Sequence, residues 1–397
     1  MLYAKIHIIM FTQRRPLLCV VVSIFFVLYV LLILWIALPP STSTTTTTTL
    51  AELDSLLQTR WAEYAQPRIG WTGSLAVYIV IPSKGTYFSS TSTDRIRDDH
   101  FRAASTTKTF TAASIMLLNQ SGRLGIDEKM TTYVDYAIPY AELITIRQLL
   151  EHRGGVWDVT NEPFTQDGKS YTADVLERDP NHQFTIDELV NVLVTNNLTY
   201  GPPGLSYNYT DTGYSILGKI IETVSAQRFD DYVRTNFVLP NSLVSTSFPW
   251  RAEEQTLPAP FVIGHTWSQN ISYEAIKLNP SGKVAEGNIV TTLIDLANWL
   301  IRLFTGATSL TLDTVETMTE TKPSIRYMRY GLGLNYVPGL GYGHDGIIDG
   351  YATSAYYDPY DQVTIVLSTS SIDADDIVAY GIFLHGICGD AKKIVAK

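Results

Sequence analysis

The sequence predicts an α+β domain, with one antiparallel sheet built from the N- and C-terminal segments, flanking helices and an inserted, mainly helical subdomain. Strand-like segments occur near residues 74–90 and again in the last third of the chain, whereas the middle is mainly helix-like. Strands grouped apart from helices are typical of this class. The chain has 397 residues, 45% of them hydrophobic, which is enough for a large core.

The N-terminal region is expected to anchor the chain in a membrane. Leu17–Leu38 carries no charge, is long enough to span a bilayer and is longer than a usual signal-peptide core. Lysine and arginine precede it, and the first charge after it is Glu52. The positive-inside tendency therefore predicts that residues 1–16 are cytosolic and that the rest is extracellular or lumenal. A cleaved signal peptide is the alternative.

Residues 39–50 are predicted to form a stalk. Nine consecutive Ser and Thr residues, Ser41–Thr49, cannot build a core and suit a solvated, O-glycosylated spacer. Four N-x-[ST] sequons permit N-glycosylation in a secretory compartment. We expect Asn208 to be too enclosed for a glycan. The sequons are at Asn119, Asn197, Asn208 and Asn270.

Residues 51–397 are predicted to be one globular domain. Its first part has the pattern of a helix, then a hairpin closed by a Pro-Ser-Lys-Gly turn, then a buried helix. The expected elements are Ala51–Ala65, Ser74–Ile81 with Thr86–Ser90, and Ser105 to about Gly122.

The remainder is predicted to run from helices to strands. An apolar stripe, Ile216 to Val224, marks a helix after the break at Gly201–Gly204, and Phe248–Pro280 is expected to be irregular. The other expected helices are Ile144–Glu151, Ile186–Thr195, Ile289–Phe304 and Asp376–Cys388, and the expected strands are Tyr327–Val337, Ala352–Tyr357 and Val363–Thr369.

Composition and missing motifs exclude several functions. A net charge of −10 argues against a nucleic-acid partner, because no basic surplus exists to neutralise phosphates. The two cysteines, Cys19 and Cys388, form no CxxC pattern. There is no G-x-S-x-G elbow and no H-E-x-x-H zinc signature.

The segment F-R-A-A-S-T-T-K-T-F-T is the first candidate for chemistry. Ser105 and Lys108 are three residues apart, so on a helix beginning there they share one face. A serine at a helix N-terminus lies in a positive field that favours developing negative charge. A lysine in an apolar setting loses its proton more easily and could then activate the hydroxyl. Alone, a Ser-x-x-Lys pattern also arises by chance.

Two further polar segments follow. Tyr209 and Asp211 lie between the Pro/Gly break and a helix, where Asp211 could equally be a cap and Tyr209 a packed tyrosine. His344 lies in G-Y-G-H-D-G, on or beside a strand, where glycines allow close approach of a ligand. A single histidine in such a turn often has no special role.

Together these segments resemble the serine β-lactamase and penicillin-binding protein family, and most closely its class C β-lactamase and D-alanyl-D-alanine carboxypeptidase/esterase branch. The resemblance covers most of the chain from Leu50 on. It includes the framing segments G-R-L-G-I-D-E-K-M, I-T-I-R-Q-L-L-E-H-R-G-G-V, P-G-L-S-Y-N-Y-T-D-T-G-Y-S-I-L-G and G-H-D-G-I-I-D-G-Y, in this order.

The resemblance implies a β-lactamase/transpeptidase-like fold and a mechanism. Ser105 would be the nucleophile that forms an acyl-enzyme, with Lys108 and Tyr209 sharing general-base work. The backbone N–H groups of Ser105 and Ile347 would form the oxyanion hole. His344 would orient the substrate or assist proton transfer. No metal or organic cofactor is implied.

Departures from the family pattern suggest the substrate. Asp211 stands where the family more often has Asn and could hold Lys108 protonated, and His344 stands where many β-lactamases have Lys. Asp345 adds a negative charge, and we expect Asp211, Asp345 and Gly346 to contact substrate. Like-charge repulsion then favours small-molecule or peptide-like esters or amides without a free carboxylate.

Two alternatives stay open, and one property is not predicted. The domain could be a catalytically silent ectodomain that binds a ligand or protein, or it could be a true β-lactamase or D,D-carboxypeptidase. The oligomeric state does not follow from the sequence.

Overall fold

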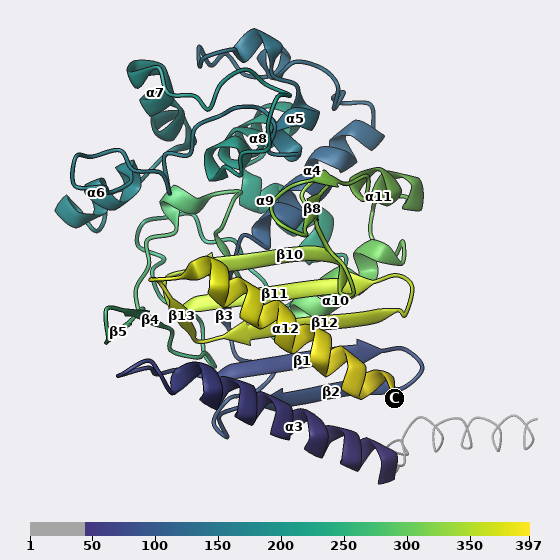
Figure 1. Cartoon of the computed structure of the whole chain (residues 1–397). Helices are drawn as coiled ribbons and strands as arrows, with labels where there is room; N and C mark the ends of the chain where they lie inside the picture. Colours follow the sequence, from purple (N-terminus) through teal and green to yellow (C-terminus); the bar gives the residue numbers. More distant parts are fainter. Residues whose placement is uncertain (1–43) are drawn as a thin grey trace, which may run out of the picture. The chain divides into compact units, whose positions relative to one another are not determined.

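The eight-stranded sheet at the centre joins the two ends of the chain. The structure, a computed structural model, describes residues 44–397 (Figure 1). The strand order is β2-β1-β12-β11-β10-β9-β8-β7, so the N-terminal hairpin pairs with the last long strand. The predicted sheet built from both ends is therefore confirmed. The strands are β1 Leu75–Ile81, β2 Gly85–Ser90, β7 Lys322–Pro323, β8 Arg329–Tyr330, β9 Asn335–Val337, β10 Gly341–Ile348, β11 Tyr351–Asp358 and β12 Val363–Thr369.

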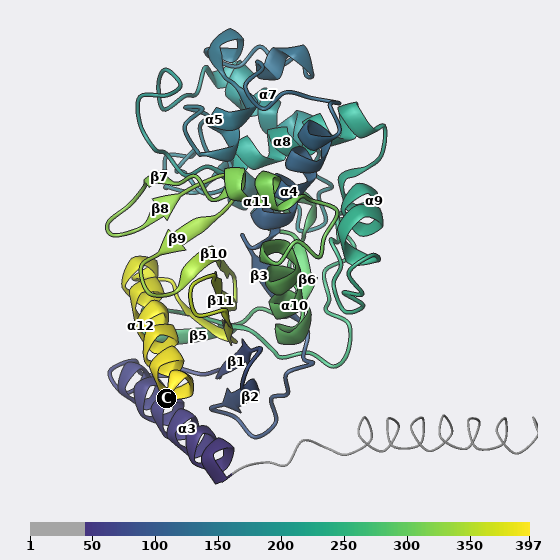
Figure 2. The same ribbon diagram turned by 90° about the vertical axis from the view of Figure 1, so that its right-hand side faces the viewer.

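Both faces of this sheet are covered by helices. Helices α3 (Thr44–Ala65, in the compact unit from Thr49 on) and α12 (Ile377–Ala396) lie against one face, and α4 (Thr107–Gln120) and α10 (Leu293–Phe304) lie on the other (Figures 1 and 2). Alternate residues of β1 accordingly belong to two separate cores: Leu75, Val77 and Ile79 pack with α3 and α12, and Ala76 and Tyr78 pack with α4 and α10.

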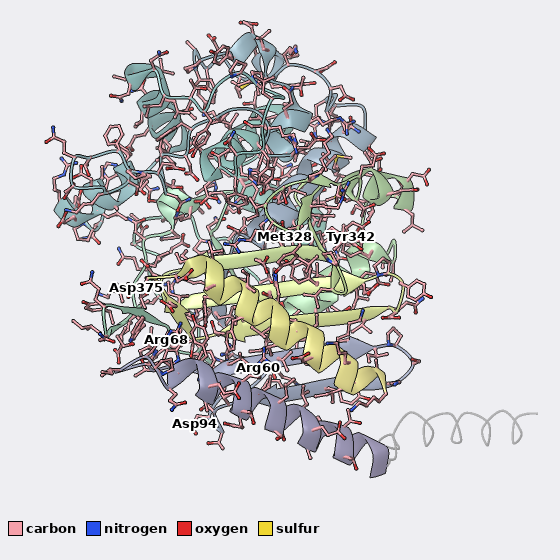
Figure 3. All side chains as sticks on the ribbon, in the orientation of Figure 1. Arg60, Arg68, Asp94, Met328, Tyr342 and Asp375 are labelled. Carbon is pink, nitrogen blue, oxygen red and sulfur yellow. The ribbon has the colours of Figure 1, made fainter. Side chains whose placement is uncertain are left out.

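Polar contacts fix α3 and the turn after it. Arg60 Nη1 lies 3.7 Å from Asp390 Oδ2 on α12. Arg68 Nε donates to Asp373 Oδ2 at 2.8 Å, and the Arg68 guanidinium lies 3.5 Å from the ring centroid of Tyr64. Arg60 and Arg68 are both labelled in Figure 3.

The mainly helical subdomain expected in the middle of the chain lies beyond the β10 side of the sheet (Figure 1). Its helix α8 packs against α4, α5 and α7. The helices are α5 Ile146–Leu150, α6 Tyr171–Arg178, α7 Ile186–Asn196, α8 Asp211–Ser225 and α9 Phe229–Val233, with α11 Leu312–Met318 nearer the C-terminus. Short 3₁₀ or π turns are η1 Met130–Thr132, η2 Ala141–Leu143, η3 Arg234–Val238 and η4 Ser281–Lys283.

Two small sheets were missed by the sequence patterns. Strand β3 (Phe101–Ala104) pairs with β6 (Ile289–Thr291), and β4 (His265–Ser268) pairs with β5 (Ile271–Glu274) and β13 (Ser371–Asp373). The helix expected over 289–304 is therefore divided, because the β-branched start of that segment pairs with β3. Phe248–Pro280, expected to be irregular, contains β4 and β5.

Helix boundaries also differ from the expectations. The helix expected from Ser105 begins at Thr107, two residues later, and the closing helix extends past Cys388 to Ala396. The helix expected from Ala51 begins at Thr44, so the end of the Ser/Thr tract is helical, and residues 39–43 of the predicted stalk lie outside the described residues.

The predicted membrane segment, Leu17–Leu38, lies outside the described residues. Among residues 44–397 no helix has the length and apolarity needed to cross a membrane. Of the four sequons, Asn197 and Asn270 are exposed, whereas Asn119 and Asn208 are half-buried.

Candidate active site

Ser105 lies in the tight turn between β3 and α4. The turn requires a positive φ of 48° at Ala104, and two threonines hold it closed. Thr106 Oγ1 donates to Ala103 O at 3.0 Å, and Thr107 Oγ1 donates to Ala104 O at 2.7 Å. Thr107 Oγ1 also accepts from Ile289 N at 3.0 Å, which ties the turn to β6. These threonines therefore position Ser105 directly before the N-terminus of α4.

Lys108 is completely buried one turn further, beneath Ser105. Its Nζ lies 3.1 Å from Ser105 Oγ, 2.6 Å from Asp211 Oδ1 and 2.8 Å from Glu286 O. The predicted placement of Ser105 and Lys108 on one face is confirmed. An ammonium has three N–H donors, and these three acceptors use all of them. In the resting site Lys108 thus donates to Ser105 Oγ.

The charge state of Lys108 agrees with this geometry. Burial lowers the pKa of Lys108, but the carboxyl groups of Asp211 and Glu286 raise it more, and the net shift is upward. The expectation that an apolar setting frees the amine is therefore wrong, because the pocket contains carboxyl groups. The expectation that Asp211 could hold Lys108 protonated stays a prediction, which their 2.6 Å contact supports.

Asp211 is the first residue of α8, and its carboxylate faces Lys108. Thr210, not Asp211, caps this helix. Burial alone raises the pKa of the Asp211 carboxyl, but Lys108 and Lys283 lower it well below its usual range. Asp211 Oδ2 accepts from Asn161 Nδ2 at 2.8 Å. Asp211 is thus an ionised group, satisfied by hydrogen bonds, in direct contact with the lysine.

Tyr209 lies across Lys108 from the helix. Its ring centroid is 4.8 Å from Lys108 Nζ. Burial and the Asp211 charge raise the pKa of Tyr209 well above its usual value, although the Ser105 hydroxyl lowers it. Tyr209 is therefore a neutral phenol that can pass a proton to or from the reacting atoms.

The His-Asp-Gly segment lies on β10, where successive side chains face opposite sides of the sheet. His344 faces the Ser105 site, whereas Asp345 faces α12. Asp345 Oδ1 lies 2.8 Å from His385 Nε2, and Asp345 Oδ2 accepts from Tyr356 OH at 2.7 Å. The expectation that Asp345 contacts substrate is therefore wrong, because its neighbour His344 occupies the inner face.

Gly346 is on the inner face with His344. A Cβ at Gly346 would lie 2.1 Å from Ala103 O, so only glycine allows β10 to approach β3 this closely. That contact brings Ile347 close to the Ser105 turn. Strand β9 pairs with β10 only through Gly341–Gly343. The oxyanion hole formed by Ser105 and Ile347 N–H groups stays a prediction that this approach supports.

His344 belongs to a chain of buried hydrogen bonds. Its Nδ1 lies 2.5 Å from Asp345 O, and its Nε2 lies 2.9 Å from Tyr330 OH. Tyr330 OH lies 3.1 Å from His152 Nε2, and Thr210 N donates to His152 Nδ1 at 3.1 Å. A carbonyl can only accept and an amide N–H can only donate, which fixes both tautomers.

These partners fix the direction of each hydrogen bond in the chain. His152 donates from Nε2 to Tyr330, and Tyr330 donates to His344 Nε2, so both imidazoles are neutral. Burial and the Lys108 charge agree with this, since they lower the pKa of His344 to about 4. His344 thus supplies no positive charge to the site, and both its ring nitrogens already have partners.

The sequence patterns missed four residues of this site. They are His152, Tyr330, Lys283 and Glu286, which surround the predicted residues. His152 lies in one of the framing segments of the family resemblance, and that position could have marked it as a residue of the site. Glu286 has only its position beside Gly287 to distinguish it. Within residues 44–397, no group of three or more His, Cys, Asp or Glu side chains is arranged to hold a metal ion.

Comparison with known proteins identifies relatives of this chain. The profile of the Beta-lactamase family matches residues 58–380. Penicillin-binding protein 4* of Bacillus subtilis (strain 168) is 30% identical over 148 residues, which is 37% of this chain and 30% of that protein. Protein flp of Staphylococcus aureus (strain NCTC 8325 / PS 47) is 30% identical over 153 residues, 37% of this chain and 28% of that protein. The matched region is thus under a third of these curated relatives' length.

Solved structures share the fold. A D-stereospecific amidohydrolase from Streptomyces sp. has a TM-score of 0.70 at 24% identity, covering 82% of this chain and 97% of its own. The D-amino acid amidase from Ochrobactrum anthropi SV3, complexed with D-phenylalanine, has a TM-score of 0.72 at 21% identity, covering 87% of this chain and 99% of its own.

Proposed function

Because this chain belongs to the Beta-lactamase family, we propose that it is a serine hydrolase that forms an acyl-enzyme through Ser105. The observation that carries the proposal is the contact of Ser105 Oγ with Lys108 Nζ at 3.1 Å, at the start of a buried helix. A nucleophile within hydrogen-bond distance of a base, which is itself held by a third group, is the general pattern of covalent catalysis.

In the mechanism that fits this geometry, Lys108 first loses one proton to solvent, against the charge of Asp211, its partner at 2.6 Å. The neutral amine then accepts the Ser105 proton while Oγ attacks the substrate carbonyl. The N–H groups of Ser105 and Ile347 stabilise the oxyanion, and Tyr209 donates a proton to the leaving group. Water then attacks the acyl-enzyme, with Tyr209 accepting its proton, and Lys108 returns its proton to Ser105 Oγ as the acyl group leaves.

The proposed substrates are esters or amides without a free carboxylate. His344 is neutral, Lys108 is paired with Asp211, and Lys283 lies 3.4 Å from Glu286 Oε1. Among the described side chains of the site, none is therefore a cation left to pair with a substrate carboxylate. One solved relative, the D-amino acid amidase, has been crystallised with L-phenylalanine amide, which supports an amide as a candidate substrate.

We expect a neutral aryl ester to be hydrolysed with a kcat/KM at least about 100-fold above that for a chromogenic cephalosporin, since an unpaired carboxylate loses affinity in a site without a free cation. Both rates are measured by absorbance on the same purified enzyme. Ser105→Ala is the control for non-enzymatic hydrolysis. Efficient cephalosporin turnover would favour a true β-lactamase or D,D-carboxypeptidase.

One observation favours the catalytically silent alternative. The raised pKa of Lys108 and its donation to Ser105 Oγ mean that the resting lysine is not a base. A domain that kept this arrangement permanently would bind a ligand without turning it over. Reaction of Ser105 with a serine-directed probe separates the two functions.

We also propose that Leu17–Leu38 anchors the protein, with the hydrolase domain outside the cytosol. Its uncharged sequence supports this proposal. The chain is expected to stay in the membrane pellet after alkaline carbonate extraction, and residues 51–397 are expected to be digested by protease added outside intact cells. Deletion of residues 17–38 is the control and should release the protein. A wild-type chain found in the carbonate supernatant would contradict anchoring.

A further inference from the structure

A second buried carboxyl group, that of Asp158, lies beside Asp211 at the N-terminus of α8. Asp158 is on the loop between α5 and α6 and is 2% exposed. Its Oδ1 accepts from Thr160 N at 3.0 Å and from Thr160 Oγ1 at 2.7 Å. Its Oδ2 accepts from Asn161 Nδ2 at 2.9 Å and from Asp211 N at 3.0 Å. Three of these four donors are N–H groups, which cannot accept, so both oxygens of Asp158 act as acceptors.

The burial of this carboxyl group is costly, and its contacts show what it holds in place. Burial and the Asp211 charge raise the pKa of the Asp158 carboxyl on balance, and its hydrogen bonds oppose the rise. Asp211 N is one of the first N–H groups of α8, which have no partner within the helix, and a carboxylate is an acceptor that this end of a helix favours. Val159 N also donates to Thr212 Oγ1 at 3.0 Å. The loop is therefore tied to the main chain at the start of α8, where Asp211 lies.

The same loop also orients the side chain of Asp211. Asn161 Nδ2, which donates to Asp158, donates to Asp211 Oδ2 as well, at 2.8 Å. Thr160 Oγ1 lies 3.4 Å from Asp211 Oδ2. The other oxygen, Asp211 Oδ1, contacts Lys108 Nζ at 2.6 Å. One oxygen of Asp211 is thus held by the loop while the other meets the lysine, so the loop determines the plane in which the carboxylate lies.

We propose that Asp158 is a positioning residue of the hydrolase site: through the Asp211 main chain and the Asn161 amide, it sets the Asp211 carboxylate against Lys108. This inference rests on the proposed function of Ser105 and Lys108. Without the acceptors of Asp158, Asp211 is free to turn and its contact with Lys108 loosens. The anion then stabilises the ammonium less, so Lys108 loses its proton at lower pH.

Several titratable groups face Lys108, and among the described residues the one that hydrogen-bonds to Asp158 is Asp211. A change at Asp158 is therefore expected to reach Lys108 through Asp211. The groups that face Lys108 are Asp211 and Tyr214 on α8, Tyr209 before that helix, Lys283 and Glu286 on the segment before β6, and the imidazoles of His152 and His344.

The first test follows the titration of Lys108 in the full chain, for wild type, Asp158→Asn and Asp158→Glu. The amide cannot accept all four hydrogen bonds, because its nitrogen is a donor. The glutamate variant keeps the charge but moves the carboxylate by one methylene group. We expect the Lys108 titration to shift to lower pH by about one unit in both variants. The measurement is carbon NMR with isotope-labelled lysine, in which Lys108→Met assigns the signal.

The matched control is Asp295→Asn. The Asp295 carboxyl is also buried and also accepts from a backbone N–H and a threonine hydroxyl, those of Ser245 at 2.8 Å and Thr246 at 3.0 Å. This variant should lower the thermal midpoint and leave the Lys108 titration unchanged. A Lys108 titration in Asp158→Asn that comes no earlier than in wild type would overturn the proposal. The same result in Asp158→Glu would mean that only the charge matters, which would overturn it too.

The second test separates this inference from the proposed function. It is the pH dependence of Ser105 labelling by a fluorophosphonate, followed by intact mass. The rising limb of the labelling rate is expected to move to lower pH with the Lys108 titration in both Asp158 variants. An unchanged limb would overturn the inference and leave the proposed function intact. A shifted Lys108 titration without labelling of any of the proteins would contradict only the proposed function, because the NMR readout does not depend on activity.

Discussion

Replacing Ser105 with alanine is expected to lower kcat/KM for a neutral aryl ester by about 10⁴-fold or more, because the covalent route is lost and only binding and oxyanion stabilisation remain. Folding should be unaffected. Ser105 is not part of the helix cap, and its hydroxyl accepts only one of the hydrogen bonds of Lys108. The measurement is steady-state hydrolysis, with the thermal midpoint recorded for both proteins.

The matched control is Ser114→Ala. Ser114 is a buried residue of α4, the helix that Ser105 precedes, and its Oγ donates to Phe110 O at 2.8 Å, away from the site. This variant should keep wild-type activity. Equal hydrolysis by Ser105→Ala and wild type would contradict the assignment of the nucleophile and would indicate a different reacting group.

Replacing Asp211 with asparagine is expected to separate stability from activity. Removing one partner of a buried ion pair leaves an uncompensated charge, which should lower the free energy of unfolding at pH 7 by about 3 kcal/mol. The same change removes the anion that raises the pKa of Lys108. If the pKa of Lys108 falls by about one unit, acylation per folded molecule near neutral pH should rise by about 10-fold.

The pH dependence of this stability difference has a definite sign. The pKa of Asp211 is depressed in the folded protein, so its contribution to stability is present above the unfolded pKa of about 3.9 and is lost as pH falls through the lower, folded value. The difference between wild type and Asp211→Asn should therefore shrink in acid. Denaturant unfolding at several pH values measures it.

A surface aspartate provides the comparison for Asp211. Asp127 is 75% exposed and pairs with Arg147 at 2.6 Å, so Asp127→Asn should cost no more than about 1 kcal/mol. A loss for Asp211→Asn as small as this, with an unchanged acylation rate, would mean that the buried pair does not control Lys108.

The sequence was sufficient for the parts of the site that depend on local spacing. Ser105 and Lys108 were expected to share a face, because three residues make about one helical turn. The two side chains are still in contact although α4 begins only at Thr107. The sheet built from both ends was predicted because strand-like apolar segments, such as the one that forms β12, occur near both ends of the domain. The segment at 289–304 was predicted wrongly as a single helix. Its first residues form a short apolar run that fits a strand as well as a helix, and only their pairing with β3 shows that they form a strand.

Other features depend on contacts that no local pattern contains. The sequence placed His344 and Asp345 on or beside a strand, but the register of β10 decides which of them faces Ser105. His152 meets Tyr330 178 residues further along the chain, and Lys108 meets the Glu286 backbone across a separation of 178 residues. The neutral state of His344 therefore required the fold.

The central claim is that Ser105 is an activated nucleophile, and intact mass after exposure to a fluorophosphonate tests it most directly. The full chain and its Ser105→Ala variant are incubated with the probe at several pH values. We expect one adduct on the wild type, formed faster as pH rises and Lys108 loses its proton, and none on the variant. A wild-type protein that stays unmodified at every pH would contradict the hydrolase assignment and favour a silent binding domain, with the ammonium of Lys108 held permanently by Asp211.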